Sequence, residues 1–219
     1  MSRFSVFAGL LTIASLALFA SAHHDVTLDV YYESQCPDSV AFITQQLGPN
    51  YNEFKDHIIV NLTPFGKASW ITADSGKTEF TCQHGPTECR GNKAQSCLMA
   101  EIDEHVSVAA ERQAKKIEIV ACAMSDKSAS SPADAVFKCA ASKGLNDEAV
   151  KHIEACTDSE RGDKLLIANG EKTIAFEKPL SFVPSIVVNG SKNQDAFRQL
   201  RSVLCGLIPD GEKHGDACK

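Results

Sequence analysis

The chain has 219 residues, 43% of them hydrophobic, and its 28 acidic side chains outnumber its 22 lysines and arginines, giving a net charge of −6. This acidic balance argues against a nucleic-acid-binding protein, because phosphate groups are bound by basic surfaces. A chain of this length can bury one sizeable core, or one core with an insertion.

The first segment is an apolar run from Val6 to Ala20 that follows Arg3 and ends in small residues. This layout is typical of a secretory signal peptide, here residues 1–22. The alternative, a membrane anchor, is disfavoured because a spanning helix needs about 20 apolar residues, and no later segment provides them. We therefore expect a mature chain of residues 23–219 with no membrane span. Without Arg3 it has 21 basic against 28 acidic side chains, a net charge of −7.

A strand, a helix and a second strand are predicted at the start of the mature chain. Residues 26–32 and 58–62 are rich in β-branched and aromatic side chains, and both segments are predicted strands. Between them, an apolar helical pattern begins at Pro37 and ends before Gly48-Pro49. Because a helix joins the two strands, they are expected to be parallel neighbours.

Helices dominate the middle of the chain. Apolar residues at every fourth position predict a long helix over residues 92–116, and small polar residues predict a loop over 123–131. A helical insertion is expected over about 123–176, with helices at residues 132–141, 147–156 and 159–176. The C-terminal part is predicted to contain a strand at 182–190 ending in an Asn-Gly turn, a helix at 193–207 and a loose tail at 209–219. No linker separates these elements, so a single domain is expected over residues 23–219.

Nine cysteines occur, an odd number for a chain that is expected to enter an oxidising compartment. At least one of them is therefore free or pairs outside the chain. Apart from Cys36, the other eight are candidates for four disulfides: Cys82, Cys89, Cys97, Cys122, Cys139, Cys156, Cys205 and Cys218. Many pairings are compatible with the sequence. The one local pairing that it suggests is Cys139 with Cys156, which would join two short helices.

Cys36 lies where the first predicted strand gives way to the first predicted helix. Helix N-termini carry unpaired backbone N–H groups and a partial positive charge, and both favour a thiolate over a thiol. The thiolate is the attacking species in thiol–disulfide exchange. This position therefore makes Cys36 the candidate nucleophile.

A cysteine-rich signature segment follows the second strand, and its fixed residues are Cys82, Gln83, His84, Gly85, Glu88, Cys89, Asn92 and Cys97. The pattern Cys-Gln-His-Gly, two residues, Glu-Cys, two residues, Asn, four residues, Cys resembles the signature of the gamma-interferon-inducible lysosomal thiol reductase family. The segment 182–190, the helical block and the two late cysteines also resemble this family. The likeness covers nearly the whole mature chain.

This resemblance implies an α/β, thioredoxin-like fold with a helical insertion and several disulfides. It implies that Pro184 is a cis-proline beside Cys36 that helps to dock the substrate chain, although most X–Pro bonds are trans. It also implies a thiol reductase of disulfide-bonded proteins that uses a small thiol as reductant and no cofactor. Such an enzyme would work in an acidic range, in lysosomes or outside the cell.

The cysteines of the signature also have the ligand types of a metal site. A zinc site would use Cys82, His84, Cys89 and Cys97, but their spacing lacks the close Cys-x-x-Cys pair of common zinc sites, so no metal is expected. In an oxidising compartment the three cysteines are instead expected to form bridges that hold this loop near the active site.

The polar signature residues have structural and functional interpretations. His84 either tunes the electrostatics around Cys36 or makes a structural hydrogen bond. Glu88 and Asn92 are expected to cap the following helix, with Asn92 near its start.

The active-site motif departs from the family pattern. Reductases of this kind use Cys-x-x-Cys, whose second cysteine resolves the mixed disulfide, whereas this chain reads Cys36-Pro37-Asp38-Ser39. Because serine forms no disulfide, three outcomes stay open: an external thiol resolves the intermediate, another cysteine of the signature loop does so, or reductase activity is lost. A protein without turnover would act by binding a secreted or cell-surface protein, or by trapping partners in lasting mixed disulfides. Ser39 is expected to donate a hydrogen bond to the Cys36 thiolate. The Asp38 carboxylate would raise the pKa of the Cys36 thiol if this carboxylate points inward.

Two sequons for N-glycosylation occur, at Asn61 and Asn189. Asn61 is the weaker candidate because Pro64 follows its sequon, whereas Asn189 falls in a predicted exposed turn. Lysosomal members of the family travel by way of their glycans. The sequons therefore leave both a lysosomal and a secreted location open.

Overall fold

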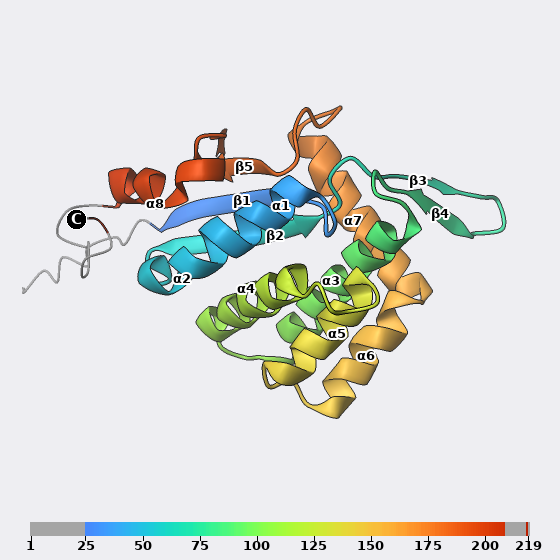
Figure 1. Ribbon diagram of the computed structural model, residues 1–219. Coiled ribbons are helices and arrows are strands. Elements are labelled where there is room, and N and C mark those ends of the chain that lie inside the picture. Colours follow the sequence, from blue (N-terminus) through green and yellow to red (C-terminus); the bar gives the residue numbers. More distant parts are fainter. Residues whose placement is uncertain (1–24, 209–217, 219) are drawn as a thin grey trace, which may run out of the picture.

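The computed structural model describes residues 25–208 and 218, and their central element is a four-stranded sheet (Figure 1). β1 (Val26–Tyr32) pairs with the parallel strand β2 (Ile58–Pro64) on one side and with the antiparallel strand β5 (Ser185–Val188) on the other. The short strand β6 (Ser191–Lys192) extends the sheet beyond β5. The parallel arrangement predicted for β1 and β2 is confirmed.

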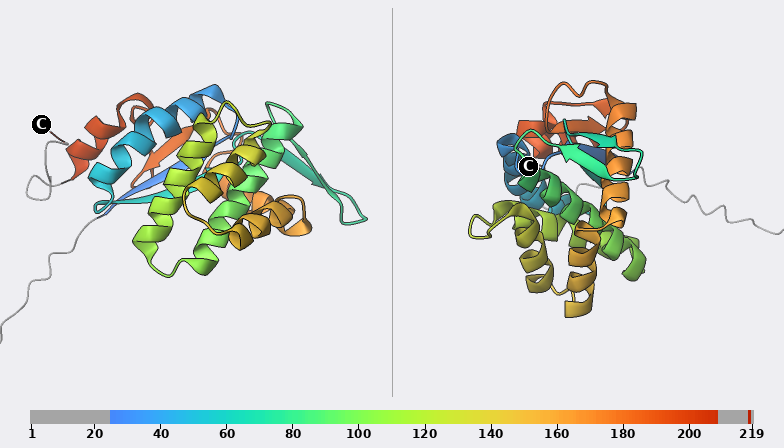
Figure 2. Two further views of the ribbon diagram at one scale, coloured as in Figure 1. Left: turned by 60° about the horizontal axis from the view of Figure 1, so that its bottom comes forward. Right: turned by 90° about the vertical axis from the view of Figure 1, so that its right-hand side faces the viewer.

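A helical run that begins directly after β1 packs on the sheet. It consists of α1 (Pro37–Ala41), the π-helix η1 (Phe42–Leu47) and α2 (Gly48–Phe54). The predicted helix end at Gly48-Pro49 is wrong, because the Gly48 N–H bonds to a carbonyl five residues back. This wider register accommodates Pro49, which has no N–H to donate. Beside the run lies α8 (Ala196–Leu207), which is the last helix of residues 25–208 (Figure 2).

The core lies between the sheet and its helices. Alternate residues of β1, namely Leu28, Val30 and Tyr32, are fully buried, as the period of a strand requires. They belong to one buried cluster with Phe42 of η1. The Tyr32 hydroxyl donates to Gln95 Oε1 at 2.6 Å, which ties β1 to the first helix of the helical block, and burial raises the pKa of Tyr32 well above 10.0.

A helical block packs against the β2 side of the sheet (Figures 1 and 2). Its members are α3 (Pro86–His105), α4 (Ala109–Ser125), α5 (Pro132–Ser142), α6 (Asp147–Thr157) and α7 (Glu160–Phe176). The last three confirm the predicted helices. The prediction of a single helix over 92–116 is wrong, because the backbone adopts an extended conformation at Val106 and Val108 and separates α3 from α4. β-Branched residues fit extended backbone better than helix, which explains the break.

Eight cysteines form four disulfides, and the ninth, Cys36, is free; all nine lie in the described part of the chain. The predicted pair Cys139–Cys156 is wrong, because each half faces a different helix. Cys139 of α5 bonds to Cys122 of α4, whereas Cys156 of α6 bonds to Cys97 of α3. The other two bridges are Cys82–Cys89 and Cys205–Cys218.

A β-hairpin that the sequence did not predict projects from the molecule between β2 and α3 (Figure 1). Its strands are β3 (Ser69–Thr72) and β4 (Thr78–Thr81). Trp70 packs edge-on against Phe65 with ring centroids 5.6 Å apart. Both rings lie over Gly170 of α7, so a residue without a side chain is needed where the hairpin meets the helical block.

Replacement of Gly170 by alanine is expected to lower the free energy of unfolding. A Cβ there would lie 2.5 Å from Trp70 and 2.7 Å from Phe65. Overpacking of this kind costs about 1–3 kcal/mol, against a gain of about 1 kcal/mol for alanine over glycine in a helix. Gly206 of α8 has open space at the same point and serves as the control, because Gly206→Ala should be slightly stabilising. Urea unfolding of both variants checks this, and a Gly170→Ala protein as stable as Gly206→Ala would contradict the packing.

The predicted signal peptide at 1–22 lies outside the described residues. The predicted loose tail at 209–219 does so as well, except for Cys218. Among the helices of residues 25–208, none combines the length and the apolar character that crossing a membrane requires.

Candidate active site

Cys36 is the N-cap residue of α1, at the end of the turn that follows β1. It retains 9% of its surface exposed and packs in a small apolar cluster with Leu180 and Val183. Its sulfur donates a hydrogen bond to the Val183 carbonyl at 3.7 Å. Tyr31 and Phe176, whose rings stack with centroids 4.5 Å apart, border this cluster. The sulfur is therefore unbridged but mostly covered by the segment that contains Val183.

The segment that covers Cys36 contains two cis peptide bonds. Val183–Pro184 is cis, as the family resemblance implied for Pro184, and Lys178–Pro179 is cis as well, which the sequence did not indicate. The side-chain amide of Gln194 donates to the Pro184 carbonyl at 2.9 Å. This bond anchors the Pro184 carbonyl, and the carbonyl of the preceding residue, Val183, accepts the bond from the Cys36 thiol.

Ser39 and Asp38 occupy contrasting environments. Ser39 is fully buried, and its Oγ accepts the backbone N–H of Glu33 at 3.3 Å. The expected bond from Ser39 to the Cys36 sulfur is not among the hydrogen bonds of residues 25–208, where the thiol donates to Val183 instead. Asp38 is exposed in the first turn of α1, so it stabilises the positive end of the helix rather than facing the sulfur.

The signature loop is attached to the turn that precedes Cys36. Asn92 Oδ1 accepts the Ser34 N–H at 2.8 Å, and Ser34 Oγ donates to the Glu88 carbonyl at 3.2 Å. Thr87 Oγ1 donates to the side chain of Gln35 at 2.9 Å. The expected helix cap at Asn92 is wrong, because α3 begins earlier, at Pro86. The buried Asn92 side chain instead holds the active-site turn from inside the helix.

Gly85 and Glu88 shape the start of α3. Gly85 has a φ of 88°, a value that favours glycine, and it precedes the first helical residue. Glu88 Oε1 accepts the backbone N–H of His84 at 3.1 Å, and Glu88 Oε2 lies 2.6 Å from His84 Nδ1. Glu88 therefore caps the helix, as expected, by accepting a backbone N–H that precedes it. Of the two roles considered for His84, the structure shows the structural hydrogen bond.

Glu33 is a fully buried carboxylate beneath the signature loop that the sequence analysis did not single out. Its Oε1 accepts the Lys67 N–H at 2.7 Å, and the Gln83 side-chain amide, oriented to donate, lies 3.1 Å from the same oxygen. His84 Nδ1 lies 3.6 Å from Glu33 and 2.6 Å from Glu88, so one imidazole bridges two buried carboxylates. Burial is the main cause that raises the pKa of Glu33 from 4.5 to about 7, and the charge of Glu88 raises it further.

Disulfide formation removes the ligands of the alternative zinc site. The sulfurs of Cys82 and Cys89 bond to each other, and that of Cys97 bonds to Cys156. The cysteines of the signature are bridges, as expected. Glu33, His84 and Glu88 bring ligand atoms within 4.8 Å of one another, but these atoms already bond to each other and to the protein backbone.

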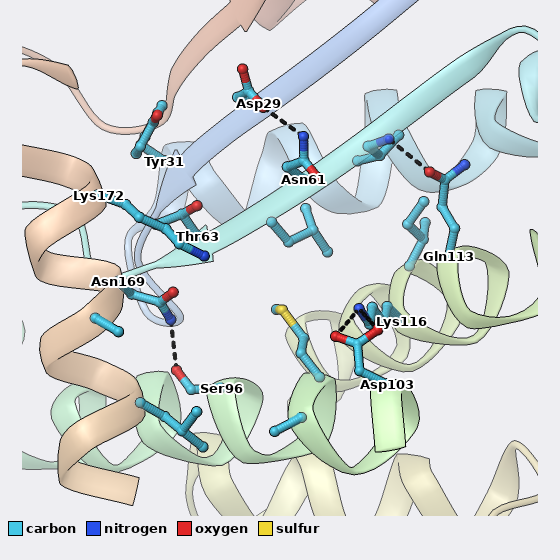
Figure 3. A pocket seen from close by; sticks show the side chains of 17 residues that line it. Asp29, Tyr31, Asn61, Thr63, Ser96, Asp103, Gln113, Lys116, Asn169 and Lys172 are labelled. Carbon is cyan, nitrogen blue, oxygen red and sulfur yellow. Dashed lines mark hydrogen bonds and ion pairs between the residues drawn. The ribbon is translucent and has the colours of Figure 1, made fainter. Parts of the chain in front are cut away.

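A cavity of about 480 Å³ lies apart from Cys36, between β2 and helices α3, α4 and α7 (Figure 3). Gln113 covers the strand edge there: its Oε1 accepts the Val60 N–H at 2.8 Å, and its Nε2 donates to the Ile58 carbonyl at 3.0 Å. Tyr31 borders both this cavity and the Cys36 cluster, but Cys36 does not line it. The cavity therefore carries none of the sulfur chemistry.

Both sequon asparagines lie on the surface. Asn61 of β2 donates to Asp29 Oδ1 at 2.8 Å. Asn189 lies in the turn after β5 with a φ of 49°, and its Oδ1 accepts the Thr27 N–H at 2.9 Å. The predicted exposure of Asn189 is confirmed, and its glycosylation stays a prediction.

Comparison with solved structures shows the fold. The chain is similar to the thiol-disulfide oxidoreductase MdbA from Actinomyces oris, with a TM-score of 0.58 and 17% identity, covering 86% of this chain and 81% of that one. It is also similar to reduced DsbA from Mycobacterium tuberculosis, with a TM-score of 0.57 and 14% identity, covering 88% and 87%. The predicted thioredoxin-like α/β fold is thereby confirmed.

Comparison with protein sequences shows the family. The family described as gamma interferon inducible lysosomal thiol reductase matches residues 27–143. GILT-like protein 1 of Drosophila melanogaster is 34% identical over 90% of this chain and 79% of its own length. The gamma-interferon-inducible lysosomal thiol reductase of Carassius auratus is 31% identical over 86% and 70%. The chain belongs to the gamma-interferon-inducible lysosomal thiol reductase family.

Proposed function

We propose that this protein is a thiol–disulfide oxidoreductase that reduces disulfides of protein substrates through Cys36. The observation that carries the proposal is that Cys36 alone of nine cysteines is unbridged and lies at a helix N-terminus beneath a cis-proline. Backbone N–H groups at that position stabilise a thiolate. Family membership supports the same chemistry.

The proposed reaction starts with attack of the Cys36 thiolate on one sulfur of a substrate disulfide. A mixed disulfide forms, and the second substrate sulfur leaves as a thiolate that takes up a proton. A small thiol then attacks the Cys36 sulfur, and the first substrate sulfur leaves. A second small thiol frees Cys36 and is released as a disulfide with the first. The substrate thus gains the two electrons that the two small thiols lose, and no metal or other cofactor takes part.

We further propose that this chemistry takes place in the secretory pathway. The predicted signal peptide, the two sequons and the four disulfides support secretion or delivery to lysosomes. We further propose that residues 23–219 act as one domain on disulfide-bonded proteins.

A catalytically silent protein that binds a secreted or cell-surface partner is the second candidate. Two observations favour it: Ser39 stands where the family motif has its second cysteine, and Cys36 keeps only 9% of its surface exposed. In that case the covering segment around Val183 would stay closed over the sulfur.

A turnover assay separates the two candidates. The purified mature protein is incubated with a disulfide-linked peptide and a small thiol at pH 5 and pH 7. Replacement Cys36→Ser is expected to reduce the rate to that of the small thiol alone, because the Cys36 sulfur is the group that attacks the substrate disulfide. Ser202→Ala, an exposed change on α8, serves as the control and should keep full activity. Activity that survives Cys36→Ser would rule out the catalytic proposal.

A further inference from the structure

One of the four disulfides lies in the loop that is attached to the active-site turn. The Cys82–Cys89 loop and the start of α3 contact residues 33–35 through the bonds from Ser34 to Glu88 and Asn92, and from Thr87 to Gln35. The remaining bridges join helices of the block or the end of α8 to the tail. Residues next to Cys82–Cys89 in the sequence therefore contact residues next to Cys36 in the sequence.

The same disulfide has the features of one that opens readily. Its two cysteines are 7 residues apart in the sequence, the shortest separation of the four bridges. The separations are 59 for Cys97–Cys156, 17 for Cys122–Cys139 and 13 for Cys205–Cys218. Short loops gain the least chain-entropy stabilisation from a cross-link. Cys82 is half-buried whereas Cys89 is buried, so Cys82 is the more accessible half of the bridge. Cys89 lies in the first turn of the 20-residue helix α3, where backbone N–H groups favour a thiolate leaving group.

We propose that Cys82 and Cys89 act as the resolving pair for Cys36, in place of the cysteine that Ser39 replaces. This inference rests on the proposed function and names the residues that complete it. Two molecules of small thiol first reduce Cys82–Cys89 and leave as their own disulfide. Cys36 then forms the mixed disulfide with the substrate.

Resolution follows by two exchanges inside the protein. The Cys82 thiolate attacks the Cys36 sulfur, and the substrate leaves as a thiolate and takes up a proton. The Cys89 thiolate then attacks Cys82 and expels Cys36, so that Cys82–Cys89 is restored. The substrate gains the two electrons that this pair loses. A free Cys36 beside a closed Cys82–Cys89 bridge, as the structure has it, is the state that ends this sequence.

The transfer requires a movement of the signature loop. Two cysteines bond when their Cα atoms lie about 4.4–6.8 Å apart, so Cys82 must approach Cys36 after its bond to Cys89 opens. Residues Gln83 and His84 are exposed, and no atom lies within 4 Å of the position that a Cβ on Gly85 would occupy. Opening the bridge removes the covalent link between this stretch and α3, and the bonds of His84 to Glu88 and of Gln83 to Glu33 must then also break. Asn92 keeps the helix attached to the turn before Cys36.

A single-turnover experiment on the full mature chain tests the proposal. The protein is treated with a small thiol without denaturant, desalted and mixed with one equivalent of a disulfide-linked peptide. The native chain is expected to release free peptide thiol and to end with Cys82–Cys89 closed. The double variant Cys82→Ser/Cys89→Ser should form the mixed disulfide at the native rate and release the peptide at least about 100-fold more slowly, because an intramolecular thiol is lost.

Two further variants complete the test. Cys205→Ser/Cys218→Ser removes a bridge distant from Cys36 and should release the peptide like the native chain. Cys89→Ser alone should accumulate a Cys36–Cys82 disulfide that peptide mapping identifies. The resolving role is overturned if the small thiol leaves Cys82–Cys89 closed, if the double variant releases peptide at the native rate, or if no Cys36–Cys82 bond appears. Absence of any mixed disulfide at Cys36 would instead overturn the proposed function itself, and the resolving role with it.

Discussion

Ser39→Cys is expected to accelerate release of the substrate from Cys36 by about 100-fold or more when Cys82–Cys89 is oxidised. The new thiol would lie three residues after Cys36 on the same helical turn, so it attacks the mixed disulfide without having to be captured from solution. The Ser39 side chain is fully buried and accepts one N–H bond, from Glu33, which a sulfur replaces at small cost. Quenched-flow measurement of free peptide thiol in the absence of added reductant gives the rate.

The matched control is Ser39→Ala, which removes the hydroxyl without adding a thiol. It should leave the mixed disulfide as long-lived as in the native chain. If Ser39→Cys releases peptide no faster than Ser39→Ala, then position 39 does not reach the mixed disulfide. In that case the serine at position 39 would not be the reason why the mixed disulfide at Cys36 needs another thiol for its resolution.

Glu33→Gln is expected to remove a stability change of about 3 kcal/mol between pH 4.5 and pH 7. The pKa of Glu33 rises from 4.5 to about 7, mainly through burial, so between these values the folded protein holds a proton that the unfolded chain has released. The folded state then binds more protons, and stability falls as pH rises, by about 1.4 kcal/mol per unit. Below pH 4.5 both states are protonated, and above pH 7 both are ionised, so the contribution is flat outside this window.

Urea unfolding at pH 4.5 and pH 7.5 measures this effect. Glutamine resembles the protonated carboxyl, so the variant should gain about 3 kcal/mol relative to the native chain as the pH rises over this window. Glu79→Gln serves as the control, because Glu79 pairs with Lys77 in water and its exposed ion pair adds little to stability. Parallel pH curves for native chain and Glu33→Gln would show that Glu33 is not held protonated in the fold.

The elements with strong local patterns were predictable. β1 and β2 alternate or concentrate β-branched residues, and the helices now seen as α5 to α7 carry start signals such as Ser131, whose Oγ accepts the Asp134 N–H at 3.2 Å. The hairpin of β3 and β4 has four-residue strands with mostly exposed residues, so it has no apolar alternation to detect. The prediction of one helix over 92–116 failed because its apolar positions, Leu98, Ile102, Val106 and Ala110, keep a four-residue spacing across the break. The backbone is extended at Val106 and Val108, which this spacing does not reveal.

Site residues that a local sequence pattern identifies were predictable. Residues whose role depends on the packing of segments far apart in the sequence were not. Cys36 follows from an odd cysteine beside a predicted strand–helix boundary, and the cis bond at Pro184 followed from the family resemblance. The pairing of Cys139 depends on which neighbouring helix its side chain faces. Glu33 was missed because its burial is produced by Gly66 and the signature loop. A Cβ at Gly66 would lie 2.2 Å from the Glu33 side chain. A glutamate directly after an apolar strand and three residues before a candidate nucleophile was the available signal.

If the Cys36 sulfur is the group that attacks a disulfide, it should react with one in the absence of any other thiol. The most direct measurement incubates the untreated mature protein with a disulfide-linked peptide in the absence of any thiol, quenches it with acid and maps the cysteine-containing peptides by mass. We expect one adduct, on Cys36, with Cys82–Cys89 and the other three bridges intact. An adduct on a different cysteine, or an unmodified Cys36 after exposure to excess disulfide, would contradict the account.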